Sequence, residues 1–257
     1  MKSKVGKQTK AIKAMKNNHT NSHFDFLDMS RGFAILLMFI YHFSFDLDYY
    51  GFIQQDFYQD AFWINFRTII VTLFLTIMGI SLYLASYRGL NKKRFRQRLL
   101  LLIIYSFLVS ISSWIMYPKA MVFFGILHFI TIASVLGLLF VQVGIVNLFL
   151  GLVFMILPQV ISHTFFDQPY LQWLGLMTEL PVTVDYVPLL PWFGVVLMGI
   201  YLGERLAQLP AESFLVRWQN KNPFSQTLSL GGRYSLHIYM LHQPLFLGIL
   251  YIISQII

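Results

Sequence analysis

Long apolar stretches recur along the whole chain, each close to the roughly 20 residues that a helix needs to cross a bilayer. They predict seven spans, at about residues 30–50, 61–87, 97–117, 122–141, 143–163, 186–206 and 227–255. The fifth stretch begins a short turn after the fourth, and residues 170–182 suit a re-entrant or interfacial helix, so six or eight spans also fit. The pattern predicts an all-α polytopic membrane protein, a bundle of about seven transmembrane helices.

Composition supports this class and excludes others. Of 257 residues, 57% are hydrophobic and only 12% are charged, and the mean hydropathy is +0.63. Soluble domains carry about twice that share of charge. The chain has no cysteine, which excludes disulfides, thiolate metal sites and a cysteine nucleophile. The formal charge of +8 comes from clusters that flank apolar stretches, as orientation signals do, so we do not expect nucleic acid as a partner.

Charge in the connecting segments predicts the topology. Residues 1–23 hold six lysines, and we expect them to be a disordered basic cytoplasmic tail touching membrane lipids, ahead of a transmembrane domain over 24–257. The segment 88–98 carries six basic residues, whereas 51–60 and 164–185 together carry five acids and no base. Basic loops stay in the cytoplasm. We therefore expect a multi-pass protein of the cell (inner) membrane with its N-terminus inside.

The first apolar stretch carries Arg31, His42 and Asp46. An ionisable group at bilayer depth costs several kcal/mol, so it normally faces the bundle interior and marks a site. Arg31 and His42 are eleven residues apart, which brings them within about 20° on one helix face and separates them by roughly 16 Å. Asp46 lies one turn beyond His42, where a carboxylate orients an imidazole for general-base work. The alternative is that Arg31 anchors at the interface and His42 only packs.

The second stretch carries small and polar residues at helical spacing: Thr68, Thr72, Thr76, Gly79 and Ser81. Such a stripe usually packs one helix on another, and we favour that interpretation over a ligand role. Arg67, near the outer end of this stretch, is expected to pair with an acid of the first helix or of the following loop.

Polar residues of two later stretches extend the candidate site. His128 lies at a depth comparable with His42, either in a shared cavity or as a satisfied packing group. Asp185 precedes Pro188 and Pro191, which fix a helix start because proline is tolerated in a first turn. The carboxylate would cap that helix or face the outer cavity, and the sequence leaves both open.

The last stretch contains Arg233, His237, His242 and Pro244. On one continuous helix, Arg233 and His237 share a face and His242 points elsewhere. Pro244 removes a backbone donor and should bend the helix just beyond His242.

Several of these residues form motifs of a known kind. Leu27, Asp28, Arg31, Gly32, Ala34 and His42, with Gly232, Arg233, Ser235, Tyr239, His242 and Pro244, resemble the transmembrane acyltransferase superfamily. That superfamily joins the acyltransferase-3 proteins to the heparan-alpha-glucosaminide N-acetyltransferase family. The segments 42–47, 125–129 and 188–194 look closest to bacterial members of the latter, and the resemblance covers residues 25–250.

The resemblance implies transfer of an acyl group, usually acetyl, from cytoplasmic acyl-CoA to a sugar or glycan acceptor at the other face. Acyl-CoA would be a co-substrate, with no tightly bound cofactor and no metal. His42 matches the histidine taken as catalytic in the acyltransferase-3 branch, and Arg31 the arginine of that motif. The lysosomal members carry a functional histidine just after the first helix. This chain has no histidine between 43 and 127, so His42 would fill the role.

These patterns give a set of candidate site residues. The catalytic candidates are His42, Asp46 and His128. The substrate-binding candidates are Arg31, Asp185, Arg233, His237 and His242, and the acyl-CoA phosphates are assigned to Arg94, Arg96 and Arg98. The pantetheine arm is comparable in length to the roughly 16 Å between Arg31 and His42. His42 would deprotonate the acceptor in direct transfer, or be acylated in a ping-pong scheme.

Two other function classes fit the same charged spans. A transporter or lipid-handling protein also places ionisable residues within the membrane. A catalytically silent membrane binding or assembly factor is the third interpretation. Thioester cleavage separates the enzyme from both, and the sequence leaves open whether the chain forms a homo-oligomer.

Overall fold

The computed structural model describes residues 24–210 and 212–256, and the predicted tail 1–23 lies outside them. The described residues form helices and turns without a strand. Within these ranges, five helices are long and apolar enough to cross a membrane: α2 (Asp25–Tyr49), α3 (Ala61–Tyr87), α4 (Lys92–Met116), α7 (Leu189–Ala207) and α10 (Ser235–Ser254). Shorter helices are α5 (Ile126–Leu138), α6 (Val146–Val160), α8 (Phe214–Arg217) and α9 (Pro223–Arg233). Helices thus occupy all seven predicted stretches, and the polytopic helical class is confirmed.

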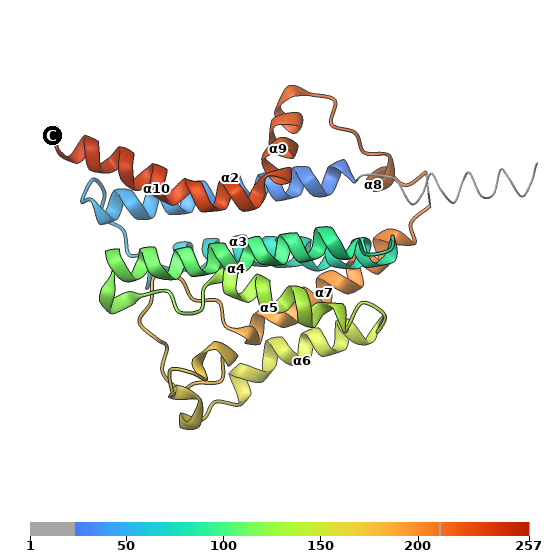
Figure 1. The fold of residues 1–257 in the computed structure, drawn as a ribbon, viewed down its shortest axis with the longest axis horizontal. Coiled ribbons are helices and arrows are strands. Elements are labelled where there is room, and N and C mark those ends of the chain that lie inside the picture. The colour runs from blue at the N-terminus through green and yellow to red at the C-terminus, as the bar shows by residue number, and fades with distance from the viewer. Residues whose placement is uncertain (1–23, 211, 257) are drawn as a thin grey trace, which may run out of the picture.

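The helices lie roughly side by side, with α2 and α10 along one flank and α6 on the opposite flank (Figure 1). The loop between α2 and α3 lies at the same end as the C-terminus of α10, and the connection from α3 to α4 lies at the other end (Figure 1). The acidic loop 51–60 and the basic connection at 88–91 are therefore at opposite ends, as the alternation of charge predicts. Which end faces the cytoplasm remains a prediction.

Close backbone approach joins α3 to α7. A Cβ added to Gly79 would lie 2.3 Å from the carbonyl oxygen of Val196, and one added to Gly199 would lie 2.5 Å from that of Thr76. Only glycine permits such contact, and side chains that are fully buried surround it. The predicted packing role of the small-residue stripe is therefore confirmed at Thr76 and Gly79.

A second close approach joins α2 to α9. A Cβ on Gly32 would lie 1.8 Å from the carbonyl oxygen of Leu228, and one on Gly232 would lie 1.9 Å from that of Asp28. At Gly231, one residue away, the nearest atom would be 4.0 Å distant, an ordinary van der Waals separation, so a side-chain carbon would fit there. The first and last parts of the membrane domain are thereby held backbone to backbone.

The structure corrects the expected form of the last stretch. Instead of one helix, it contains α9 and α10, separated at Tyr234, and α9 stands across the end of α10 (Figure 1). Arg233 and His237 therefore do not share a helix face. The chain breaks at Tyr234, whereas α10 continues as one helix through Pro244.

Two other segments differ from expectation. The segment 170–182 contains a three-residue 3-10 turn, Gln172–Leu174, and otherwise irregular chain, so it is not a re-entrant helix. The segment 88–98 is mostly helical, because Asn91 caps Arg94 and α4 begins at Lys92. The start of α7 is as predicted, since Pro188 is its N-cap.

Candidate active site

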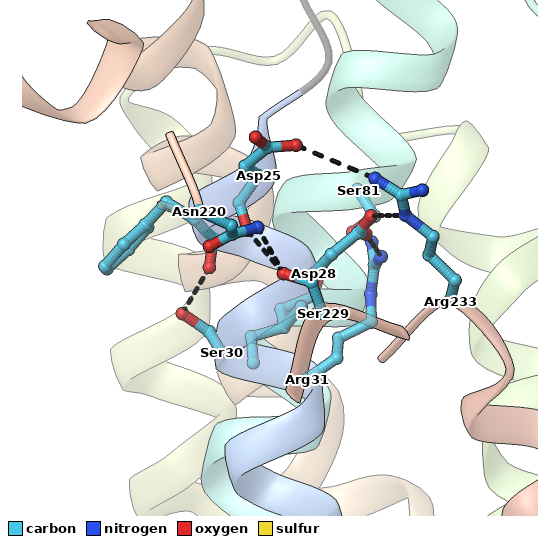
Figure 2. Close-up of polar contacts among 10 residues, drawn as sticks. Asp25, Asp28, Ser30, Arg31, Ser81, Asn220, Ser229 and Arg233 are labelled. Carbon is cyan, nitrogen blue, oxygen red and sulfur yellow. Dashed lines mark hydrogen bonds and ion pairs between the residues drawn. The ribbon is translucent and has the colours of Figure 1, made fainter. Parts of the chain in front are cut away.

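The basic end of the α2–α9 contact holds a cluster of charges (Figure 2). Asp28 lies between two guanidinium groups: Nη1 of Arg31 donates to its Oδ1 at 2.7 Å, and Nε of Arg233 donates to its Oδ2 at 3.0 Å. Arg233 also lies 3.7 Å from a carboxylate oxygen of Asp25. Asp28 is buried, so its charge is balanced by these cations rather than by water.

Arg31 connects this cluster to α3, because it also donates to the hydroxyl of Ser81. Its side chain is 24% exposed and that of Arg233 is 52% exposed, so both retain accessible surface for an anion. Ser81, Ser134 and Arg98 line a cavity of about 60 Å³ between α3, α4 and α5. Arg94 and Arg96 are exposed on the first turns of α4. The predicted phosphate-binding arginines thus lie at the same end of the bundle as Arg31.

Further along α2, His42 contacts His242 of α10. Their ring centroids are 5.0 Å apart with the planes at 62°. Phe39 stacks on His242 at 5.8 Å, and Phe246 meets its edge at 5.9 Å. His242, a substrate-binding candidate that was expected to point away from the face of Arg233 and His237, is the immediate neighbour of His42, which was not predictable from either helix alone.

Asp46 does not pair with His42, as predicted, but with Gln243 of α10. Asp46 is buried, 1% exposed, and its Oδ1 accepts a hydrogen bond of 2.7 Å from the amide Nε2 of Gln243. Gln243 follows His242 in α10. The contact between His42 and His242 and the hydrogen bond between Asp46 and Gln243 therefore lie about one helical turn apart along the interface of α2 and α10, here called the α2–α10 seam. The carboxylate is bound to α10 rather than oriented toward the ring of its own helix.

Tyrosines gather where this seam reaches the acidic end. The hydroxyl of Tyr50 donates to the carbonyl of Leu247 at 3.3 Å, and the rings of Tyr49 and Tyr117 are 5.7 Å apart. Burial and then the neighbouring Tyr49 and Asp46 raise the pKa of Tyr117 to about 12. Its hydroxyl therefore keeps its proton at neutral pH and remains a hydrogen-bond donor.

His128 belongs to a different group of contacts. Its Nδ1 accepts from the backbone amide of Gly125 at 3.2 Å, and its Nε2 lies 3.2 Å from the hydroxyl of Ser110, which donates to Val122. Both ring nitrogens are used, one of them at the N-terminus of α5. These contacts give His128 a structural account that needs no substrate.

Asp185 caps a helix, but not the one that follows it. Its Oδ2 accepts from the backbone amide of Ile126, the first residue of α5, at 2.9 Å. Burial raises the pKa of Asp185, and the amide of Ile126 and the charge of Arg67 oppose that shift. Arg67 was expected to pair with an acid of the first helix or of the loop after it, but the carboxylate whose charge it influences is Asp185, in the loop before α7.

The sequence did not reveal three side chains that contact candidate residues: Tyr105 beside His237, Gln243 beside Asp46, and Ser81 beside Arg31. His237, expected to bind substrate, lies 2.8 Å from the hydroxyl of Tyr105 and so joins α10 to α4. Gln243 and Ser81 hold Asp46 and Arg31. The available signal was a polar residue within an apolar stretch, which marks Gln243 as clearly as its histidine neighbour.

Comparison with known proteins supplies the family. The family model for heparan-alpha-glucosaminide N-acetyltransferase, catalytic, matches residues 23–244. That match contains both the charge cluster around Asp28 and the histidine pair. Searches among curated proteins and among solved structures gave no match.

Proposed function

Because the chain belongs to the heparan-alpha-glucosaminide N-acetyltransferase catalytic family, we propose that it transfers an acetyl group from acetyl-CoA across the cell membrane. The donor would bind at the basic end of the bundle. The acceptor, a sugar hydroxyl or amine of a glycan, would be presented at the acidic end. Several apolar helices and the family together indicate a multi-pass membrane acetyltransferase.

The observation that carries this proposal is the contact between His42 and His242 at the seam of α2 and α10. Imidazole is the side chain whose ordinary pKa suits proton transfer near neutral pH. Placing two such rings, from helices far apart in the sequence, within the apolar part of a bundle costs free energy. Ionisable residues in such positions usually have a function. We propose that the acetyl carbon is transferred here.

Arginines support the assignment of the donor end. Arg31 lies eleven residues before His42 on the same helix, a separation of roughly 16 Å along its axis, which the pantetheine arm of CoA can span. Arg94, Arg96 and Arg98 would add attraction for the CoA phosphates. The thioester would then reach His42 while the nucleotide stays at the mouth of the bundle.

The test is thioester cleavage by purified full-length protein in detergent. Acetyl-CoA and a sugar acceptor are supplied, and a thiol reagent reports the CoA released. His42→Ala should reduce acceptor-dependent release on the order of 10²-fold or more. His163→Ala, which alters an exposed loop histidine, is the matched control and should retain activity. Wild-type turnover in folded His42→Ala, with loss in His128→Ala, would move the chemistry to the other histidine.

Neutralising the three α4 arginines tests the donor end separately. We expect a higher KM for acetyl-CoA and an unchanged KM for the acceptor. Unchanged acetyl-CoA affinity would restrict these arginines to membrane orientation.

A further inference from the structure

Three buried polar atoms at the α2–α10 seam have no hydrogen-bond partner in the described part of the chain. They are Oδ2 of Asp46, Oε1 of Gln243 and Nε2 of His242. Asp46 is 1% exposed and His242 is 4% exposed. Buried polar groups are nearly always paired, so neighbouring unpaired atoms on adjoining residues require an explanation.

The hydrogen bonds that do exist show the chemical character of the unpaired atoms. Nδ1 of His242 lies 2.5 Å from the backbone carbonyl of Tyr239. A carbonyl only accepts, so Nδ1 carries the proton and Nε2 of the neutral ring is a bare acceptor. Gln243 uses its NH₂ group to bind Asp46, which identifies its unpaired atom as the carbonyl oxygen. The remaining oxygen of the Asp46 carboxylate is also an acceptor.

All three unpaired atoms are therefore hydrogen-bond acceptors that lack a donor. Water supplies two donors, but a sugar supplies several at fixed spacing, from hydroxyl groups or an amine. Further along α10, Tyr50 donates to the carbonyl of Leu247 and lies beside Tyr49, which contacts Tyr117, and the rings of these tyrosines suit the apolar faces of a sugar. Phe39 and Phe246 cover His242 on its other sides.

We propose that Asp46, Gln243 and His242 form the acceptor subsite, which binds a sugar through its hydroxyl or amino donors, and that His242 is the proton acceptor. The proposal rests on the acetyltransferase function given above. In this proposal the two histidines have different roles. His242 contacts the acceptor, and the neighbouring His42 contacts the thioester. Asp46 is a binding residue for the acceptor rather than the orienter of His42.

The transfer step balances with these groups alone. The acceptor hydroxyl or amine gives its proton to Nε2 of His242, and its electron pair forms the new bond to the acetyl carbonyl carbon. The carbon–sulfur bond breaks, and its electron pair leaves with the sulfur of CoA. The proton on His242 then passes to that sulfur, which releases the CoA thiol and restores the neutral ring.

The experiment uses full-length protein in lipid nanodiscs with acetyl-CoA and two probes, glucosamine for an amine and methyl β-D-glucoside for a hydroxyl. Asp46→Asn and Gln243→Met should raise the acceptor KM about tenfold or more, as loss of a hydrogen bond to a charged or buried group does, and leave the acetyl-CoA KM within about twofold. His242→Ala should lower kcat about 10²-fold. It should also remove the acid limb of the pH–rate profile, which a purely structural histidine would not affect.

Asn147 provides a matched control. Its side-chain oxygen is also buried and unpaired, but it lies on α6 and its amide donates to Phe140. Asn147→Ala should leave both KM values unchanged. Equal effects of Asn147→Ala and Asp46→Asn on the acceptor KM would overturn the subsite, since they would indicate loss of packing alone.

Binding without chemistry separates this proposal from the function on which it rests. Glucosamine should raise the melting temperature of the wild-type protein, and not that of Asp46→Asn, when no acetyl-CoA is present. If the wild type binds glucosamine but transfers no acetyl group, the acetyltransferase function is refuted and the acceptor subsite is supported. If the wild type transfers acetyl groups and the acceptor KM is unchanged in Asp46→Asn and Gln243→Met, the acceptor subsite is refuted and the acetyltransferase function is supported.

Discussion

The paired glycines of α9 allow a sharp test of how the charge cluster is held together. Gly231 and Gly232 are neighbours on one helix, and Gly→Ala increases intrinsic helix propensity at both by up to about 1 kcal/mol. Only Gly232 touches α2: its added Cβ would lie 1.9 Å from the backbone oxygen of Asp28, against 4.0 Å to the nearest atom at Gly231. Gly232→Ala should therefore destabilise the protein, and Gly231→Ala should not.

The size of the effect follows from the displacement. An ordinary contact begins at 3.4 Å, so the two backbones must separate by about 1.5 Å (3.4 minus 1.9). Overpacking of this kind costs about 1–3 kcal/mol. The hydrogen bond from Arg233 to Asp28, now 3.0 Å, would not survive that shift, which adds about 1 kcal/mol for a partly exposed pair. We expect a total near 2–4 kcal/mol.

Thermal unfolding in detergent, followed by tryptophan fluorescence, measures the difference between the two variants. For a chain of this size the expected drop in melting temperature is on the order of 5–10 °C for Gly232→Ala. Acetyl-CoA affinity should fall with it, because the Asp28 cluster is displaced. Equal melting temperatures for Gly231→Ala and Gly232→Ala would show that α9 does not rest on α2 as described.

Replacing Asp28 with Asn should destabilise the protein by about 1–3 kcal/mol, because two arginines lose their shared carboxylate, and calorimetry in detergent measures this. His128→Ala should lower the melting temperature through the lost cap of α5, with acceptor KM unchanged if the role is structural. Burial raises the pKa of Asp185, so its contribution to stability is present below its unfolded pKa near 3.9 and is lost as pH rises through the folded value. Asp185→Asn should therefore flatten the decline in melting temperature with rising pH above about 4, and a parallel decline in both proteins would contradict this. A reporter fused at Lys93 should be cytoplasmic, and a periplasmic signal would reverse the topology.

Much of the fold was predictable because hydrophobic length is a local property. Each apolar stretch contains a helix, and the proline pair before α7 marks its start. The internal break at Tyr234 was not predicted, although Gly231 and Gly232 lie three and two residues before it and each weakens a helix.

The candidate site was predictable only in part, because it depends on which helices touch. Arg31 and His42 stand out in the sequence as ionisable residues in an apolar stretch. Asp28 lies three positions from Arg31 on the same helix, so that contact is a local one. The contacts of Asp28 with Arg233 and of His42 with His242 join residues about 200 positions apart, on which periodicity carries no information. The assignment of Asp46 to His42 failed for that reason, since the i, i+4 rule describes neighbours on one helix and the actual partner, Gln243, is on another.

The seam between α2 and α10 also determines when the site appears during biosynthesis. The ribosome delivers α2 first, and α10 contributes His242 and Gln243 about 200 residues later. Contacts of such long sequence separation form late, after most of the bundle has inserted. A nascent chain that has not yet reached α10 therefore lacks the histidine pair, and we expect no transfer activity before α10 is in place. Cutting the chain between α7 and α8 and expressing the two pieces together should restore activity, because the seam needs both α2 and α10 but not an unbroken chain between them.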